Sequence, residues 1–375
     1  MGTVAELRLR HFRNYTALDL SFDDGISVFV GDNGEGKTNL LEGVYYLALL
    51  RSFRCHRVRA LQQWGADGFY AAARLRRSRA DATGPGRIEV SFGERRKLRV
   101  DGQDVSRTSD FINQFLCVAL APEDIALVKG AAGERRRFLD ILLSQLDPSY
   151  LAALREFTSA LKARNVILRE IGRYGESSLA AYDDLVVRHG AAVTAARAAF
   201  VEELAECMNR DLVPALAPPV KPVQIEYQSA VTRAAGKRQD KWAFAEAYGR
   251  ILARTAERDR REGHTTRGPH RDDLGLSLAG EPLSEYGSEG QCRIVSLMLR
   301  LAAGDLLLNS SDRKEEVVFL VDDVMGELDP TRQEAFFRAL SRRGRQIFLA
   351  CTEIPSWLPD EAAIYHVQRG TVTRP

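Results

Sequence analysis

The sequence predicts an α/β protein into which a helical segment is inserted, and three observations lead to this fold class. A glycine-rich loop near residue 31 lies between an apolar run and a helix-like segment. Segments with strand and helix periodicity alternate near both ends of the chain. Between them, the apolar residues keep helical spacing. We therefore expect three divisions, 1–130, 131–264 and 265–375, of which the first and third form one α/β domain.

The glycine-rich loop has the residues that a phosphate-binding loop requires. Gly31 to Thr38 fit G-x-x-x-x-G-K-[ST] at every fixed position, and a helix is predicted from Asn39 to Leu50. Inward-turned N–H groups and the helix N-terminus bind phosphates, while Lys37 would reach the β- and γ-phosphates and Thr38 would hold Mg²⁺. The alternative is a turn that binds nothing. The predicted nucleotide contacts are Gly31, Asp32, Asn33, Gly34, Glu35, Gly36, Lys37, Thr38 and Asn39.

Strands are predicted before and after this loop in the first division. Two alternating segments, 6–10 and 18–22, read as antiparallel strands joined by a turn at residues 13–15. Further strands are predicted at 69–76, 87–92, 97–100 and 115–120.

The middle division is predicted to be helical. Helices are expected at 134–146, 151–171, 178–212 and 241–261, with Gly172 and Gly175 ending the second. Apolar residues spaced by threes and fours along 182–207 predict a seam between helices, and so an antiparallel hairpin.

The last division returns to α/β character. Strands are predicted at 274–278, 317–321 and 346–351, helices at 289–308 and 331–342, and a hairpin at 364–373. We expect these elements to share one sheet with the strand that precedes the phosphate loop.

Two carboxylates follow the apolar strand that begins at Val317. In phosphate-loop ATPases such a strand ends beside the loop, so Asp322 would hold Mg²⁺ and Asp323 would polarise the attacking water. The pattern alone is weak, because strands often end in Asp, but the phosphate loop far upstream strengthens it. Asp329 before Pro330 also fits a plain helix N-cap.

The segment from Tyr286 to Gln291 opens a predicted helix. It resembles the signature motif of the ABC ATPase superfamily, in which a Ser and a Gly at a helix N-terminus bind the γ-phosphate of the opposite subunit. Ser288, Gly290 and Gln291 are the predicted contacts. Taken alone, Ser288 would be read as an ordinary N-cap.

The arginines are unevenly distributed. Residues 51–99 hold 13 Lys or Arg and four Asp or Glu, on a chain whose net charge is +2. Such a segment indicates either a polyanion site or solvated strand faces. The candidate DNA contacts, chosen by charge alone, are Arg54, Arg57, Arg76, Arg77, Arg135 and Arg136, together with Arg137.

Further segments narrow the resemblance to the RecF family. Leu9 to Tyr15 resembles the opening of RecF proteins. Pro122 to Ile125, continuing to Gly130, together with Arg135 to Asp140, is similar to a RecF signature, and so is Arg267 to Leu274. The resemblance implies an ABC/SMC-type ATPase head with a short helical lobe in place of a long coiled coil.

The resemblance also implies function. It implies ATP and Mg²⁺ as ligands, and an ATP-dependent homodimer that sandwiches two nucleotides and opens on hydrolysis. It implies binding to double-stranded DNA near single-strand junctions or gaps, and action with RecR and RecO to load RecA in DNA replication and repair. Lys37, Asp323 and Ser288 carry over as catalytic residues, and Asp329 matches the D-loop. Arg13 and Asn14 match a nucleotide-proximal turn.

Several positions depart from the ABC pattern. Glu289 stands in the signature where Gly is usual, and Pro122 to Asp124 stand where a glutamine loop is expected. Thr352 replaces the switch histidine, and Asp323 replaces the common Glu. We therefore expect slow hydrolysis, suited to a timer or clamp.

Composition restricts the remaining classes. No apolar run reaches the ~18 residues of a membrane helix, and residues 1–8 contain no signal-peptide core. The five cysteines form no C-x-x-C pair, so a cytoplasmic protein is expected. The ATP-hydrolysing subunit of a membrane transporter is the alternative function, since it shares the nucleotide motifs. A phosphate-loop kinase is a third.

Overall fold

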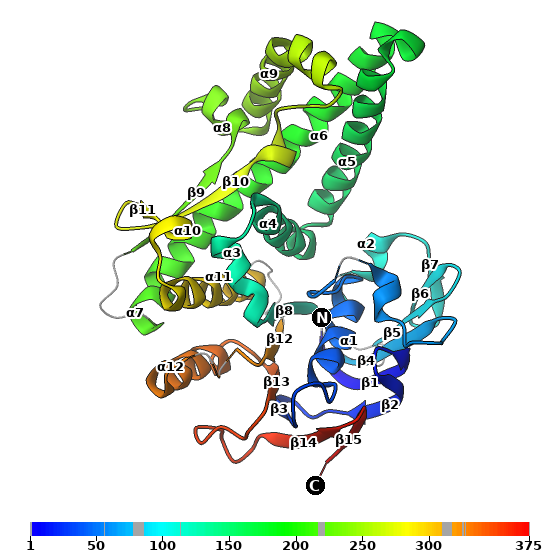
Figure 1. The fold of residues 1–375 in the computed structure, drawn as a ribbon, viewed down its shortest axis with the longest axis vertical. Helices are drawn as coiled ribbons and strands as arrows, with labels where there is room; N and C mark the ends of the chain where they lie inside the picture. Colours follow the sequence, from blue (N-terminus) through cyan, green and yellow to red (C-terminus); the bar gives the residue numbers. More distant parts are fainter. Residues whose placement is uncertain are drawn as a thin grey trace. The chain divides into compact units, whose positions relative to one another are not determined.

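The computed structural model describes residues 2–55, 57–77, 86–112, 114–216, 222–309, 317–324, 326 and 328–374. The chain forms two compact units (Figure 1). The head comprises Met1–Ile125, Asp211–Pro219 and Arg293–Pro375, and the lobe comprises Ala126–Arg210 and Val220–Cys292. The sequence-based divisions differ from these units chiefly at residues 265–292, which belong to the lobe.

A mostly parallel sheet carries the phosphate loop in the head. Its strand order is β15-β14-β3-β13-β12-β8, and all neighbours are parallel except β14 and β15. The central strands are continuous apolar runs, as expected for strands covered on both faces. The strand bounds are β3 Gly25–Val30, β8 Leu116–Leu120, β12 Val317–Asp322, β13 Gln346–Cys351, β14 Ala363–Gln368 and β15 Thr371–Thr373.

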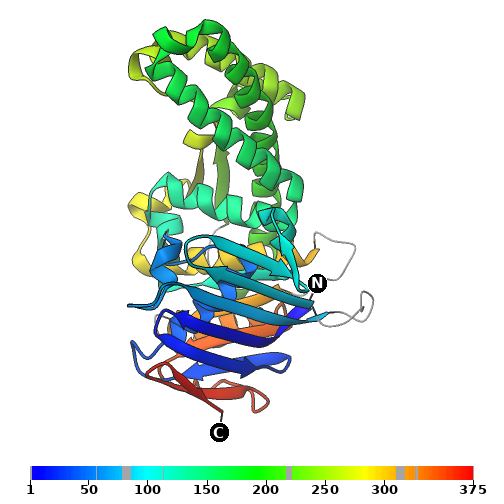
Figure 2. The ribbon, with the colours of Figure 1, turned by 90° about the vertical axis from the view of Figure 1, so that its right-hand side faces the viewer.

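A second, antiparallel sheet of the head has the order β2-β1-β4-β5-β6-β7, and its strands lie side by side in Figure 2. Helix α1 (Lys37–Leu49) packs against strands of both sheets, which explains why it is apolar almost all round. The strand bounds are β1 Gly2–Phe12, β2 Tyr15–Ser21, β4 Phe69–Arg77, β5 Gly86–Phe92, β6 Arg96–Val100 and β7 Gln103–Val105.

One buried side chain joins the two head sheets. The Gln346 amide accepts a hydrogen bond of 2.8 Å from Val4 N and donates one of 2.7 Å to Val4 O. The register of β1 against β4 shifts just after Val4, so Gln346 satisfies backbone groups at an irregular point of the ladder.

Short helical segments and one long helix complete the head. Asp329 caps α12 by accepting from Arg332 N, with Pro330 in the first turn, as predicted. Helix α11 begins in the lobe and continues into the head. The bounds are η1 Val58–Leu61, α2 Thr108–Phe111, η3 Pro122–Ile125, α7 Val213–Leu216, α11 Glu289–Asn309 and α12 Pro330–Ser341.

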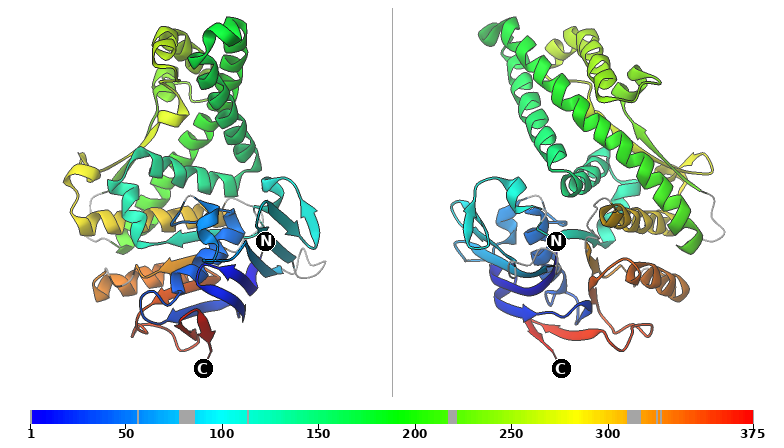
Figure 3. Two further views of the ribbon diagram at one scale, coloured as in Figure 1. Left: turned by 45° about the vertical axis from the view of Figure 1, so that its right-hand side comes forward. Right: turned by 180° about the vertical axis from the view of Figure 1, so that it is seen from behind.

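Long helices dominate the lobe, and α5 packs along α6 as the predicted hairpin (Figure 3). The boundary between them differs from the prediction: α5 ends at Arg169, Gly172 already lies in α6, and α6 is interrupted at Gly175. The helix bounds are α3 Ala126–Lys129, α4 Ala132–Leu146, α5 Pro148–Arg169, α6 Ile171–Cys207, α8 Ala230–Ala235, α9 Lys241–Glu262 and α10 Leu283–Tyr286, with a π-helical turn η4 Met208–Leu212 and a 3₁₀ turn η5 Pro269–Arg271.

The lobe has its own three-stranded sheet, in the order β11-β10-β9. Its strands are β9 Val223–Gln228, β10 Asp273–Leu278 and β11 Glu281–Pro282. The prediction that the strand at 274–278 shares the sheet of the phosphate loop is therefore wrong, because β10 pairs with β9 and β11 instead. Strand β9 was not predicted, although Val223, Ile225 and Tyr227 alternate.

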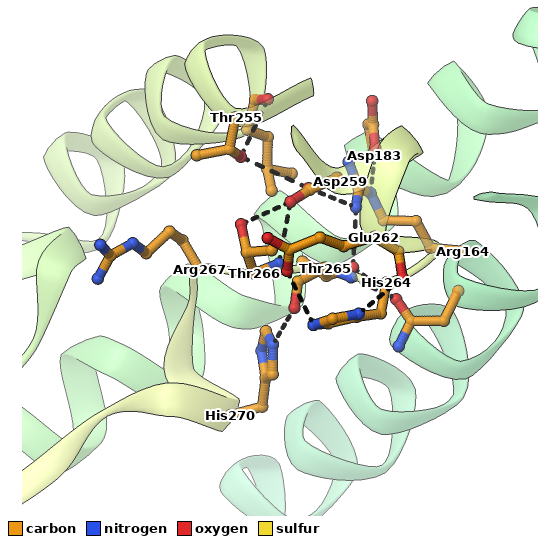
Figure 4. A network of polar contacts seen from close by, with 12 residues as sticks. Arg164, Asp183, Thr255, Asp259, Glu262, His264, Thr265, Thr266, Arg267 and His270 are labelled. Atoms are coloured by element: carbon orange, nitrogen blue, oxygen red, sulfur yellow. Dashed lines mark hydrogen bonds and ion pairs between the residues drawn. The ribbon is translucent and has the colours of Figure 1, made fainter. Parts of the chain in front are cut away.

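A buried polar network joins the helices of the lobe (Figure 4). Arg164 of α5 forms ion pairs with Asp183 of α6 and Asp259 of α9. Arg164 also donates to the Thr265 hydroxyl, and the Thr266 hydroxyl donates to Asp259. Among the described residues, no helix combines the length and apolar content needed to cross a lipid bilayer.

Candidate nucleotide-binding site

The phosphate loop has the backbone geometry that its glycines permit. It leaves β3 at Val30 and enters α1 at Lys37. A Cβ at Gly31 would lie 2.2 Å from Val367 O, so this position has no room for a side chain. Gly36 has φ +122°, a conformation that residues with side chains rarely adopt. The sequence motif therefore corresponds to a real constraint on the loop.

Lys37 lies within the loop that it was predicted to serve. Its side chain is only 6% exposed, and Nζ donates to Gly31 O at 2.6 Å and Asp32 O at 2.9 Å. These bonds hold the ammonium group at the centre of the loop, at the N-terminus of α1. A phosphate there would meet the positive charge, the loop N–H groups and the helix dipole together.

Thr38 and Asp322, the two predicted metal ligands, lie in contact. The Thr38 hydroxyl donates to Asp322 Oδ1 at 2.8 Å. Strand β13 lies between β3 and β12, so the carboxylate reaches the loop from two strands away along the same sheet edge. Burial raises the pKa of Asp322 to about 6, although the hydrogen bond from Thr38 opposes this rise. A buried carboxylate without a cation is costly, which fits a site for Mg²⁺.

Asp323 directly follows this strand in an unusual conformation. Its φ of +51° is left-handed, and its backbone N–H donates to Ala350 O at 3.1 Å. Aspartate tolerates this region better than most residues, but the backbone there is still strained. The turn distinguishes Asp323 from Asp322, which continues the strand.

The tip of the β1–β2 hairpin reaches the phosphate loop. Asn14 donates through Nδ2 to Glu35 O at 2.9 Å and accepts at Oδ1 from Asn39 Nδ2 at 2.9 Å. The Tyr15 hydroxyl donates to Gly36 O at 3.0 Å. The structure therefore brings together the predicted residues Asn14, Glu35 and Asn39.

Arg13, also predicted at this turn, contacts α1. Its Nε donates to Glu42 Oε2 at 2.7 Å and its Nη2 to Glu42 Oε1 at 2.8 Å. Glu42 is fully buried and also accepts from the Ser52 hydroxyl. The hydrogen bond to Glu42 raises the pKa of Arg13, although burial opposes it. Arg13 thus anchors the hairpin to α1.

Arg54, predicted as a DNA contact, lies beside the nucleotide site. Its Nη1 donates to Asn39 Oδ1 at 3.1 Å, and its charge lowers the pKa of Asp322 against the effect of burial. The arginine spacing in the sequence did not predict that Arg54 lies beside the nucleotide site, because this position depends on how the chain folds back after α1. Glu123 acts in the opposite direction and raises the pKa of Asp322.

The signature segment forms a capping box in the lobe. Ser288 N donates to Gln291 Oε1 at 2.9 Å, and Gln291 N donates to Ser288 Oγ at 3.3 Å. The reading of Ser288 as an N-cap is therefore correct. Ser288, Glu289, Gly290 and Gln291 are all exposed, so this helix N-terminus remains open to a ligand.

The DNA candidates differ in their surroundings. Arg135 is buried and forms a two-point ion pair with Asp273, while Arg136 donates to Asp272 O at 2.7 Å. Both side chains thus contribute to the structure of the lobe, and their role as DNA contacts stays a prediction. The sequence could not reveal these contacts, since the partners lie about 136 positions away.

Two further candidates lie on β4. Arg76 is paired with Asp24 and donates to Phe22 O at 2.6 Å, so it too serves the fold. The side chain of Arg77 lies outside the part that the structure describes. Arg57 is exposed.

Comparisons with known proteins cover nearly the whole chain. A family model described as the RecF/RecN/SMC N-terminal domain matches residues 3–357. The DNA replication and repair protein RecF of Streptococcus uberis is 33% identical, over 98% of this chain and 99% of its own. The protein of the same name from Heliobacterium modesticaldum is 35% identical, over 99% of each chain.

Solved structures give the same result. The structure of the recombination mediator protein RecF with ATP in the RecFOR pathway matches with a TM-score of 0.89 and 27% identity, over 99% of this chain and 97% of that one. An Smc head domain from Pyrococcus furiosus matches with a TM-score of 0.56 and 14% identity, over 99% and 95% of the chains, which shows the fold alone. The predicted SMC-type head is therefore confirmed.

These matches decide between the alternatives. They span nearly the whole chain and include the lobe as well as the nucleotide motifs. The transporter alternative is wrong, because the full-length relatives are DNA replication and repair proteins. The chain belongs to the RecF family.

Proposed function

We propose that this protein is an ATP-dependent DNA-binding protein of recombinational gap repair. The observation that carries the proposal is the contact between Thr38 and Asp322 beside a complete phosphate loop. Relatives named for DNA replication and repair, and a solved relative with ATP, support it. The finer points, from Mg²⁺ to the partner proteins, follow from family membership and the residues present.

The head would bind ATP through residues 31–39. Lys37 would hold the β- and γ-phosphates, and Thr38 with Asp322 would hold Mg²⁺. When bound, Mg²⁺ would neutralise part of the phosphate charge. Asp323, turned away from the strand by its left-handed backbone, would orient the attacking water.

A second copy of the chain would complete the site. The exposed capping box at Ser288 offers helix N–H groups, which suit the γ-phosphate of another protomer. Gly290 and Gln291 would contribute to the same surface, with Asp329 at the dimer interface. The negative charge of Glu289 would oppose close approach of phosphate. With Asp323 and Thr352 replacing the usual residues, this favours slow hydrolysis that releases DNA as a timer.

The bound polyanion would be duplex DNA near a single-strand junction. Contacts to phosphate do not read sequence, so affinity should depend steeply on salt and weakly on sequence. Partners equivalent to RecR and RecO would then cooperate in loading RecA.

Light scattering tests the dimer. We expect the mass of the wild-type protein to double with ATP and Mg²⁺, while Ser288→Arg remains monomeric. Ser177→Arg is the matched control, because Ser177 is an exposed serine of α6 and should leave dimerisation unchanged. If ATP binds to the wild type without changing its mass, the signature does not act across a dimer.

A further inference from the structure

The segment that follows α1, residues 51–67, has the features of a nucleic-acid contact. Four exposed arginines lie in it, and Trp64 is fully exposed. We call this segment the arginine–tryptophan loop. Its arginines are Arg51, Arg54, Arg57 and Arg59.

The charges of this loop are not neutralised locally. Arginines of the antiparallel sheet form ion pairs with neighbouring acids, as Arg74 does with Glu6 and Arg87 with Glu89. By contrast, no ion pair within the described part of the chain involves an arginine of the loop. The basic segment seen in the sequence therefore contains strand arginines that are paired with acids and loop arginines that form no ion pair with a described residue. The loop arginines are available to a polyanion.

The loop backbone just before Trp64 is held in a defined position. Arg13 N donates to Leu61 O at 2.7 Å, and Gln63 N donates to His11 O at 2.8 Å. Gln63 Nε2 also donates to Thr16 Oγ1 at 2.9 Å, and Leu61 is fully buried. These contacts fasten the backbone immediately before Trp64 to the β1–β2 hairpin. Because this backbone is already placed, the loop loses little entropy when the indole binds.

An open surface depression adjoins the indole. It is lined by Arg13 of the β1–β2 hairpin and by loop residues that include Arg59, Gln62, Trp64 and Asp67. An aromatic face, a guanidinium and amide side chains together suit a nucleotide better than an apolar group.

We propose that Trp64 stacks on an unpaired base where duplex DNA passes into a single strand, while Arg57 and Arg59 contact the adjacent phosphates. Stacking on an aromatic ring tolerates any sequence, because every base has a π-face. Inside a continuous duplex both faces of each base are already stacked, so Trp64 finds its partner only at a junction, gap edge or end. This inference rests on the proposed function, because it assigns junction preference to one residue.

Tryptophan fluorescence tests the stacking directly. The chain has three tryptophans, so Trp242→Phe with Trp357→Phe leaves Trp64 as the sole emitter. We expect its emission to be quenched by gapped DNA and by single-stranded DNA, and to change little with a continuous duplex. Emission that responds equally to gapped and continuous DNA overturns the proposal.

Binding measurements by fluorescence anisotropy test the energetic role. Trp64→Ala should weaken binding to gapped DNA by about 5- to 100-fold and leave continuous duplex binding unchanged. Trp64→Phe should retain most of the preference. Trp242→Ala is the matched control, because Trp242 is also largely exposed but lies on α9 of the lobe. The double variant Arg57→Ala with Arg59→Ala should weaken binding to gapped and continuous DNA alike and reduce the salt dependence of binding.

The outcomes separate the two proposals. If the protein with ATP binds neither DNA, the proposed function fails. If it binds DNA and Trp64→Ala has no effect on the preference for gaps, the proposed function stands and the stacking role is refuted. Trp64 would in that case be free to contact a protein partner.

Discussion

The Thr38 hydroxyl donates a hydrogen bond to Asp322 Oδ1 across 284 positions of sequence. The contact exists because β3 and β12 run parallel in one sheet, so their carboxyl ends share an edge. Two short motifs that are far apart in the chain are thereby brought together at the site that we propose holds Mg²⁺.

Replacing Asp322 by Asn should separate metal binding from nucleotide binding. The amide retains the shape but lacks the charge that Mg²⁺ requires. Loss of even outer-shell partners costs about 10- to 100-fold in metal affinity, so Mg²⁺-dependent ATP affinity should fall by at least about 100-fold. Calorimetric titration of ATP with and without Mg²⁺ measures this. Equal affinity of wild type and variant at saturating Mg²⁺ would show that another group holds the metal.

Asp323→Asn should impair hydrolysis and spare ATP binding, in contrast to Asp322→Asn. ATP and Mg²⁺ binding should persist, because the metal carboxylate is intact, while turnover falls by about 10²- to 10⁴-fold if Asp323 orients or deprotonates water. The variant should then accumulate as an ATP-bound dimer in light scattering. A variant that hydrolyses ATP at the wild-type rate would remove Asp323 from the reaction.

Arg13→Ala should destabilise the head by leaving a buried charge without its partner. Glu42 is fully buried, and Arg13 supplies its ion pair and two of its hydrogen bonds, the Ser52 hydroxyl donating another. Breaking a buried pair costs about 3–5 kcal/mol, whereas an exposed pair contributes about 1 kcal/mol or less. The control is Arg99→Ala, which removes an exposed pair with Asp104. Urea unfolding measures both, and similar losses in the two variants would contradict the buried-charge explanation.

The nucleotide site was predictable from sequence because its determinants are local. The glycines set the backbone of the loop, and the residues before and after Gly31 to Lys37 fix a strand and a helix. The proximity of Asp322 followed from the general behaviour of parallel sheets. The capping by Asp329 needed only its own four-residue segment.

The partners of charged side chains could not be predicted in this way. Arg135 and Arg57 look alike in sequence, yet one is buried against Asp273 and the other is exposed. Likewise, the alternation of Leu274 and Leu276 predicts a half-buried strand but does not say which sheet it joins. Both questions depend on contacts between distant segments, which local periodicity does not contain.

His270 should make the lobe sensitive to acid. Burial lowers its pKa from 6.5 to about 4, and its Nε2 lies 2.9 Å from Thr265 O, so the neutral ring donates there. Between pH 6.5 and 4 the unfolded chain binds a proton that the folded chain does not. Stability from this group is therefore complete above pH 6.5 and is lost as the pH falls toward 4.

Between pH 6.5 and 4, the free energy of unfolding should fall by about 1.4 kcal/mol per pH unit because of His270, or by about 2 kcal/mol between pH 6.5 and 5. His270→Gln keeps a donor and removes the titration, so its free energy of unfolding should depend less on pH by that amount. His264→Gln is the control, because His264 is exposed. Urea titrations at the two pH values give the difference, and identical pH dependence in wild type and His270→Gln would refute the assignment.

The ion pair between Arg164 and Asp259 should be the strongest polar determinant of lobe stability (Figure 4). Arg164 is 1% exposed and Asp259 is fully buried, and their 2.9 Å contact joins α5 to α9. Arg164→Met keeps the length of the side chain but leaves Asp259 as an unpaired buried charge, at a cost of about 3–5 kcal/mol. Adding Asp259→Asn should recover part of this loss, because the remaining group is neutral. Arg250→Met removes an exposed pair with Glu246 on the same helix and should cost at most about 0.5 kcal/mol. The free energies of unfolding of the wild type and the three variants test this explanation. It is contradicted if Arg164→Met costs no more than Arg250→Met. It is also contradicted if adding Asp259→Asn to Arg164→Met lowers the stability further.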